Sequence, residues 1–335
     1  MANQQPLPGI REWDTAQGWR VVELHYKADP EKNVKGWKES TKRALGLSDA
    51  DWDREFEIDW TAGLGDCYFD KDSLRTHYLP RAGGAHYRGV MIPGKGKGDI
   101  PEFVTQAGGA VTVWRLPERI TGGVGRKRYL GRYIIGADPA EGLEKGDAAA
   151  AYVLDRVRFE IVAAVHGRLV PDAFAMILDR LGRWYSEPDL GPHEVALLGV
   201  EANNHGNTVL NVLSRTLRYP KLYAQTQQGG GARRLGWFTS SRTKPLVIDG
   251  LAKVVAEKEL VIHDKALLGE MMTYISKDGK LGAAGSSHDD RVMAAAIAVQ
   301  LHKMRYTPQV HVPKENGMFA KMRQAGQGGD SWVAV

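Results

Sequence analysis

The residues best placed to do chemistry in this sequence are four acids at the ends of apolar segments. Asp138 and Glu201 each close an apolar run, and Asp289 with Asp290 opens the alanine-rich segment 292–301. If the runs are strands and the segment is a helix, these carboxylates can converge on one edge of a sheet. Clustered carboxylates repel one another and stay ionised best around a hard cation. The pattern therefore predicts a divalent-metal site.

A pair of metal ions about 3.5–4 Å apart can activate a water molecule and stabilise the leaving oxygen of a phosphodiester. This reaction uses bridging carboxylates and needs no nucleophilic side chain. Asp147 lies in the loop after Asp138, and His288 precedes the acidic pair. We assign both residues a supporting role in the predicted site.

Each acid also has an ordinary structural interpretation. Asp138 precedes a proline, and turns of that composition are common. The asparagines that follow Glu201 are favoured helix N-caps. Asp289 and Asp290 could themselves cap the last helix and interact with its dipole. The metal site is favoured because His288 adjoins the pair and the helix is too apolar to face water, so that its first turn must reach the sheet edge.

Other catalytic motifs are absent from the sequence or incomplete. It contains no Gly-x-Ser-x-Gly elbow and no His-Glu-x-x-His helix. The run Gly94-Lys95-Gly96 approaches a phosphate-binding loop, but no Ser or Thr follows Lys95, and Pro101 interrupts the next segment. ATP binding is therefore not expected there.

Basic residues lie on the segments between the acids and could contact DNA phosphates without regard to base sequence. The alternative is a solvated charged surface, which is the usual role of such residues. We predict DNA contacts for Arg233, Arg234, Trp237, Arg242, Lys244 and Lys277.

The composition is that of a soluble globular protein. Of 335 residues, 43% are hydrophobic and 25% charged, and no apolar run approaches the ~20 residues that span a bilayer. Cys67 is the only cysteine, so a disulfide framework and a cysteine-based zinc site are excluded and a cytoplasmic location is expected. A net charge of +5 permits nucleic-acid binding without demanding it.

The hydrophobic pattern predicts an α/β fold with a mixed sheet flanked by helices. Strands over 132–138, 148–154 and 159–165 form an antiparallel meander, and helices and strands then alternate up to a last helix at 289–303. The alternating elements are a helix at 171–185, a strand at 195–201, a helix at 207–218, a strand at 221–225, a helix at 243–257, a strand at 259–262 and a helix at 265–275. Residues 81–128 are predicted to be loops and a hairpin.

Four groups of residues resemble the nuclease domain of tailed-phage terminase large subunits. They stand in the order and spacing of that family: 135–142 with Gly146-Asp147, 199–206, 236–239 with Thr243-Lys244, and 288–294. The resemblance covers roughly residues 19–305. It implies an RNase H-like fold and two Mg²⁺ or Mn²⁺ ions, with Asp138, Glu201 and Asp289 or Asp290 as ligands.

The resemblance also implies a domain organisation. Residues 1–128 would be an N-terminal connector region similar to the junction between the family's packaging ATPase and its nuclease. Residues 129–305 would be the nuclease domain and residues 306–335 a flexible tail. The Walker motifs of the family's ATPase are missing, so we expect a fragment, a split-gene subunit or a remnant that cuts DNA but does not translocate it unaided.

The function implied is that of an endonuclease that cuts concatemeric viral DNA during genome packaging in the host cytoplasm. Its partners would be double-stranded DNA, the terminase small subunit, the portal protein and a separate packaging ATPase. Two alternatives remain open at this point. One is another RNase H-like nuclease, such as a junction resolvase, and the other is a non-catalytic module that docks on DNA or the capsid.

Overall fold

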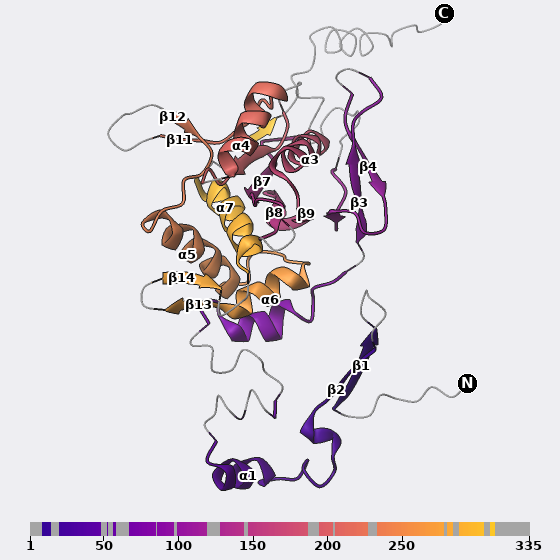
Figure 1. Ribbon diagram of the computed structural model, residues 1–335, viewed down its shortest axis with the longest axis vertical. Coiled ribbons are helices and arrows are strands. Elements are labelled where there is room, and N and C mark those ends of the chain that lie inside the picture. The colour runs from indigo at the N-terminus through magenta and orange to yellow at the C-terminus, as the bar shows by residue number, and fades with distance from the viewer. Residues whose placement is uncertain are drawn as a thin grey trace, which may run out of the picture. The chain divides into compact units, whose positions relative to one another are not determined.

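A seven-stranded mixed sheet forms the centre of the larger of two units into which the chain folds in this computed structural model (Figure 1). The larger unit comprises Phe69–Met271 with Ser286–Val335, and the smaller comprises Met1–Tyr68 with Met272–Gly285. The structure describes residues 9–14, 20–47, 52, 56–57, 67–84, 86–96, 99–118, 128–143, 147–186, 194–203, 205–226, 233–277, 280–283, 288–304 and 309–311.

The described part of the smaller unit contains two strand pairs, a short 3-10 helix and one α-helix. Its elements are β1 (Ile10–Asp14), β2 (Arg20–Leu24), η1 (Tyr26–Ala28), α1 (Trp37–Leu45), β13 (Tyr274–Lys277) and β14 (Lys280–Ala283). Strand β1 pairs with β2 and β13 with β14, both antiparallel. An aromatic cluster in which Trp52 stacks on Phe56 at 4.3 Å also includes Tyr26 and Trp37.

The sheet of the larger unit has the strand order β10-β7-β8-β9-β5-β3-β4. Strands β7 (Tyr133–Asp138), β8 (Ala149–Asp155) and β9 (Glu160–Gly167) form the predicted antiparallel meander. Strand β10 (Leu197–Val200) then runs parallel to β7. The predicted mixed sheet is confirmed.

The side chains of β7 point alternately to the two faces of the sheet. Both faces are apolar, and helices cover both of them. Tyr133, Ile135 and Ala137 share one core with α3 (Pro171–Trp184) and α4 (Gly206–Asn211). The short π-helical segment η4 (Val212–Thr216) continues α4 on that side. The other face is covered by α7 (Asp290–Met304), against which α5 (Thr243–Ala256) packs (Figure 1).

The sheet is wider than the sequence predicts, because part of 81–128 belongs to it. Strands β3 (Tyr87–Ile92), β4 (Glu102–Thr105) and β5 (Val111–Val113) extend it beyond β9. This pairing is non-local: Val111 lies opposite Val165. Short strands in a glycine-rich segment show little apolar periodicity in the sequence. They form strands because they pair with other segments of the chain. The predicted boundary at 128 therefore does not coincide with an edge of the sheet.

Two other predicted strands shrink in the structure. Residues 259–262 make only an isolated bridge between Val261 and Glu160. In 221–225 only the end forms a strand, as β11 (Ala224–Thr226) pairs with β12 (Arg233–Leu235).

The remaining elements are short. They are η2 (Ser73–Tyr78), α6 (Lys265–Thr273), β6 (Arg128–Leu130) and β15 (Gln309–His311). Strand β15 pairs with β6, so a described piece of the predicted tail is a strand, while the rest of 306–335 lies outside the described residues. The loop-like run at Gly94 joins two antiparallel strands, β3 and β4, and does not lead into a helix. Among the described helices, none is both long and apolar enough to traverse a bilayer.

Helix α7 lies unusually close to β7 because Gly136 has no side chain. A Cβ at Gly136 would come within 2.2 Å of the Ala294 carbonyl oxygen and 2.5 Å of the Ala298 amide nitrogen. Both atoms belong to the helix backbone, which cannot move aside without moving the whole helix. The first turn of α7 carries the acidic pair, so this contact sets where the pair lies.

We predict that Gly136→Ala destabilises the fold by about 1–3 kcal/mol, the usual cost of forcing extra volume into a packed core. The free energy of unfolding from denaturant titration measures this. Gly269→Ala is the matched control, because a Cβ there meets nothing within 4 Å and alanine favours the α6 helix. Equal stability of the two variants would contradict the close approach.

Candidate metal centre

Two acids lie side by side at the ends of the parallel strands β7 and β10. Gly136 and Gly199 both face α7, since a Cβ at either would meet atoms of that helix. Asp138 and Glu201 are two residues further along their strands and therefore face the same side. Ala137 lies opposite Val200, and the Glu201 amide donates to the Ala137 carbonyl oxygen at 2.8 Å, so the two acids lie on adjacent strands at the same level. The structure thus brings together the two strand-end acids that the sequence analysis selects.

The other two acids come from the start of α7. The backbone amide of Ala148, just before β8, donates to Asp290 Oδ2 at 3.2 Å. Lys244 Nζ donates to Asp289 Oδ2 at 3.0 Å. Among the described residues, no hydrogen bond joins either carboxylate to an amide of α7. Neither acid acts as the helix cap that the ordinary interpretation supposes.

The cap of α7 is supplied instead by Glu270 from α6. Glu270 Oε2 accepts the backbone amide of Arg291 at 3.0 Å, and its Oε1 pairs with the guanidinium Nε of the same residue at 3.1 Å. A carboxylate at a helix N-terminus satisfies an unpaired amide and interacts well with the helix dipole. Asp289 and Asp290 are consequently available for other ligands.

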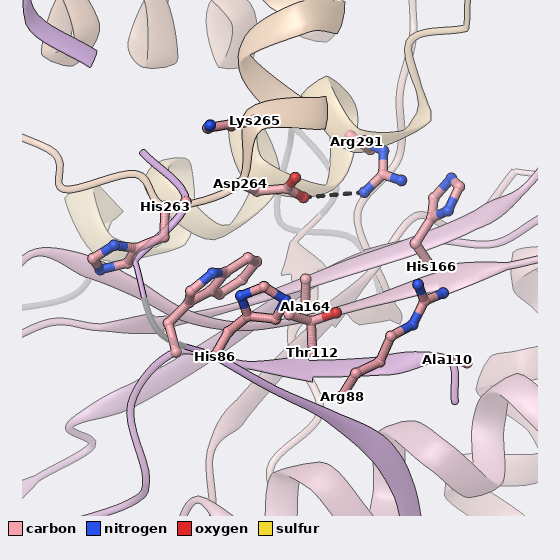
Figure 2. Close-up of a pocket in the computed structure, with 12 residues that line it drawn as sticks. His86, Arg88, Ala110, Thr112, Ala164, His166, His263, Asp264, Lys265 and Arg291 are labelled. Carbon is pink, nitrogen blue, oxygen red and sulfur yellow. Dashed lines mark hydrogen bonds and ion pairs between the residues drawn. The ribbon is translucent and has the colours of Figure 1, made fainter. Parts of the chain in front are cut away.

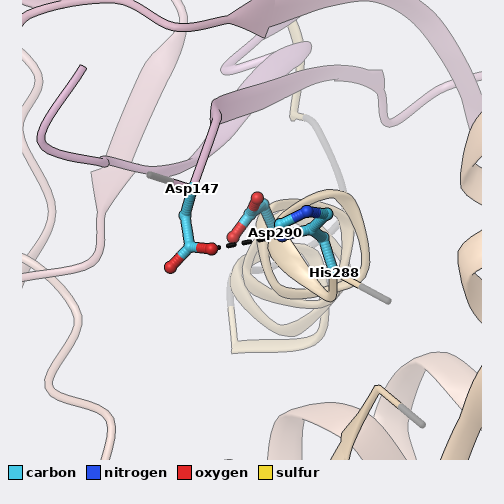
Figure 3. Close-up of side chains that lie close together, drawn as sticks. All are labelled: Asp147, His288 and Asp290. Atoms are coloured by element: carbon cyan, nitrogen blue, oxygen red, sulfur yellow. Dashed lines mark hydrogen bonds and ion pairs between the residues drawn. The ribbon is translucent and has the colours of Figure 1, made fainter. Parts of the chain in front are cut away.

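Asp290 also belongs to a group of three side chains that could hold a cation (Figure 3). Ligand atoms of Asp147, His288 and Asp290 all lie within 4.8 Å of one another. His288 Nδ1 lies 3.1 Å from Asp147 Oδ1. The two residues predicted to play a supporting role thus contact the acidic cluster directly.

The acids raise one another's pKa values. Burial raises the pKa of Asp138 well above its ordinary value, and the charges of Glu201, Asp290 and Asp289 raise it further. The pKa of Asp290 rises to about 6, through burial and the charge of Asp147, although the Ala148 amide and His288 oppose the shift. Crowded carboxylates of this kind are relieved by a divalent cation, and their oxygens are the ligands that Mg²⁺ and Mn²⁺ prefer.

The backbone beside Glu201 is fixed by Trp237, which the sequence analysis assigns to DNA binding. Trp237 bonds on both sides of Glu201: its amide donates to the Val200 carbonyl oxygen, and its own carbonyl accepts the Ala202 amide, each at 2.7 Å. Its ring is only 4% exposed and stacks on Tyr223. The predicted DNA contact of Trp237 is therefore corrected. An aromatic ring next to the core is more stable when it is buried than when it is exposed at the surface.

The basic residues of the prediction fall into different environments. Arg233 and Arg234 are exposed on β12, and the Arg234 guanidinium lies 4.1 Å from the Phe238 ring centroid. Arg242 is exposed just before α5. Lys244 turns into the acidic cluster, where it pairs with Asp289. The side chain of Lys277 lies outside the described part of the chain.

Sequence reasoning misses two residues that support the site. Glu270 caps α7 from another helix, and no local pattern could have shown this. Asn203 Nδ2 donates to Glu201 Oε1 at 3.3 Å and to the Thr239 carbonyl oxygen at 3.1 Å, which orients the carboxylate. Its position two residues after a strand-end acid was the available signal.

No protein-family model and no curated protein matches the sequence. The chain is similar in structure to the large terminase nuclease of thermophilic phage G20c with bound magnesium, at 21% identity and a TM-score of 0.41 over 58% of this chain and 89% of that one. It is also similar to the large terminase nuclease domain of Thermus phage P74-26, at 21% identity and a TM-score of 0.37 over 58% of this chain and 94% of that one. A manganese-soaked terminase nuclease domain of human cytomegalovirus is 14% identical, with a TM-score of 0.37, over 54% and 89%.

We predict that the metal-free protein loses stability from Asp290 as the pH rises. The folded-state pKa of about 6 exceeds the ordinary 3.8. The stability that protonated Asp290 contributes to the folded state is therefore fully present below about pH 4 and is lost as the pH rises through 6. Asp290→Asn cannot ionise and should become more stable relative to the parent across that window, by roughly 1.4 kcal/mol per pH unit at most. Denaturant titrations from pH 4 to 7.5 in chelator measure the difference, and a difference that does not vary with pH would contradict it.

Proposed function

We propose that this chain is a divalent-metal-dependent DNA endonuclease of the large terminase nuclease type. The observation that carries the proposal is the placement of Asp138, Glu201 and Asp290 at one edge of the sheet, where the charges of Glu201 and Asp290 raise the pKa of Asp138. The motif order in the sequence supports it independently. The biological substrate would be concatemeric viral DNA that is cut during genome packaging.

The ligands for two cations can be assigned to two adjacent groups. Asp138 and Glu201 would hold one ion, and Asp147, His288 and Asp290 would hold the other. When bound, such ions activate a water molecule and stabilise the leaving oxygen. Asn203 keeps the Glu201 carboxylate oriented. Lys244 holds Asp289 and balances part of the negative charge of the cluster.

A docking module would also be expected to bind DNA, so cleavage is the property that separates the proposals. Supercoiled plasmid is incubated with Mg²⁺ or Mn²⁺, with and without chelator. Metal-dependent nicking or linearisation supports a nuclease, and preference for a four-way junction over linear duplex would favour a resolvase. Absence of metal-dependent cleavage by the folded protein would overturn the proposed function.

We predict that Asp138→Asn reduces cleavage to the level seen with chelator while the fold is retained. The amide keeps the shape of the side chain but removes the charge that holds the cation. Metal at a hundredfold excess over its Kd should stabilise the parent by about 2.7 kcal/mol, and the variant by less. Cleavage assays and melting curves with and without metal measure both effects.

The matched control for this experiment is Asp172→Asn, which changes an exposed acid in the first turn of α3. It should leave both the cleavage rate and the metal-induced shift in Tm unchanged. Full cleavage by folded Asp138→Asn would remove that residue from the site.

We predict that Arg233→Ala combined with Arg234→Ala weakens DNA binding to a similar extent for all sequences. Phosphate contacts release counterions, so each lost contact should reduce the log–log salt slope by about 0.9. Fluorescence anisotropy over a range of salt concentrations measures the slope. Arg215→Ala, an exposed arginine of η4, is the control, and an unchanged slope in the double variant would place β12 away from the DNA.

A further inference from the structure

A second polar pocket of about 280 Å³ lies on the sheet beside the metal centre (Figure 2). Its floor is formed by residues of β3, β5 and β9, and its other side by the start of α6 and by Arg291 of α7. The residues that matter chemically are His86, Arg88, His166, Asp264, Lys265 and Arg291. Figure 2 shows Arg88, His166 and Arg291 gathered at one end of the pocket.

The pocket carries more positive charge than its own carboxylate can balance. Three cationic side chains and one carboxylate line it, and Arg291 also pairs with Glu270 of α6. Asp264 is already engaged, since it accepts from the Tyr152 hydroxyl at 2.7 Å and from Arg291 at 3.0 Å. Arg88 and Lys265 have no carboxylate partner among the described residues.

The two unbalanced cations are held in place without being neutralised. Arg88 Nε donates to the Gly109 carbonyl oxygen at 2.8 Å, which fixes the guanidinium while its two outer nitrogens remain available. The Lys265 side chain packs over Gly83, where a Cβ would come within 2.7 Å of its Cε. A fixed guanidinium fork whose outer nitrogens are available suits a phosphate group.

His166 adds a neutral hydrogen-bonding group to this end of the pocket. Burial lowers its pKa to about 4, and the charges of Arg291 and Arg88 act in the same direction. The imidazole is therefore neutral at pH 7 and can donate one hydrogen bond to an anion. No described residue hydrogen-bonds its ring.

The basic pocket is continuous with the metal centre. His166 and Arg291 also line a neighbouring pocket of about 420 Å³, whose other lining residues include His288 and Asp290. Arg291 directly follows Asp290 in α7. A nucleic-acid strand carries a phosphate at every nucleotide, so a strand whose reacting phosphate lies at the acids can place another phosphate beyond His166.

We propose that the basic pocket binds a non-scissile phosphate of the same DNA strand that is cut at the metal centre, with Arg88 as its principal contact and Lys265 as a further cation of the same pocket. The proposal rests on the nuclease function proposed above. It gives the strand a defined path from the acids past His166. A free phosphate or a mononucleotide offers the same chemistry, and the experiment separates these sources from DNA.

DNA binding is measured by fluorescence anisotropy in chelator, over a range of salt concentrations, for the parent and for Arg88→Gln, Lys265→Gln and the double variant. Arg88→Gln should reduce the log–log salt slope by about 0.9, the value for one phosphate contact. Arg88→Lys keeps the charge and should restore the slope. Lys253→Gln, which changes a side chain that is 67% exposed on α5, is the matched control and should leave the slope unchanged. Circular dichroism and melting curves verify the fold of each variant.

Orthophosphate and a mononucleotide are titrated into the same proteins and followed by ³¹P nuclear magnetic resonance. If Arg88→Gln abolishes their binding but leaves the DNA salt slope unchanged, the pocket serves a free phosphate ligand and the proposal is overturned. Unchanged slopes in all pocket variants, or no DNA binding by the parent, also overturn it.

Plasmid cleavage by the parent protein is assayed in parallel with Mg²⁺ and Mn²⁺. Cleavage together with unchanged slopes leaves the nuclease function standing and removes the pocket. A reduced slope without any cleavage keeps a phosphate contact at the pocket but removes the nuclease function, and with it the assignment of that phosphate to a strand that is cut.

Discussion

The contact between Gly136 and the backbone of α7 is the constraint on which the site depends. It allows the helix to lie directly on the sheet, with Ala294 and Ala298 over β7. Small residues line that side of the helix, and nine of its fifteen residues are buried in the core, so its angle to the sheet is fixed by dense packing. The acids of its first turn are positioned by that packing and not by a flexible loop.

The acids could not bind a ligand if their carboxylates were hydrogen-bonded to the backbone amides of α7 as helix caps. Glu270 removes that demand, because it accepts the Arg291 amide and pairs with the Arg291 side chain. Asp290 then turns to the Ala148 amide, and Asp289 to Lys244. One acid on a neighbouring helix thus frees two others for ligand binding. The repulsion that remains among the acids would be relieved by a divalent cation.

The central meander and the helices that follow it could be predicted from the sequence, because their apolar periodicity is strong and local. Strand β5 could not, since three residues that follow a glycine-rich turn become a strand by pairing with the distant strands β3 and β9. The proximity of Asp138 and Glu201 was predictable from two parallel strands that end at one edge. The cap by Glu270 and the burial of Trp237 depend on contacts between distant segments, which one sequence does not reveal.

Two adjacent residues of α7, Asp290 and Arg291, belong to the negative and the positive part of this surface respectively. Asp290 and Arg291 differ by about 100° around the helix, so the first reaches Asp147 and His288 while the second reaches Asp264 and Glu270. Asp264 and Glu270 hold the guanidinium on their side of the helix. The same turn of helix therefore presents carboxylates to cations and borders a basic pocket without the two charges cancelling. A polyanion could approach such a surface through the cations, which offset the repulsion that the acids alone would exert.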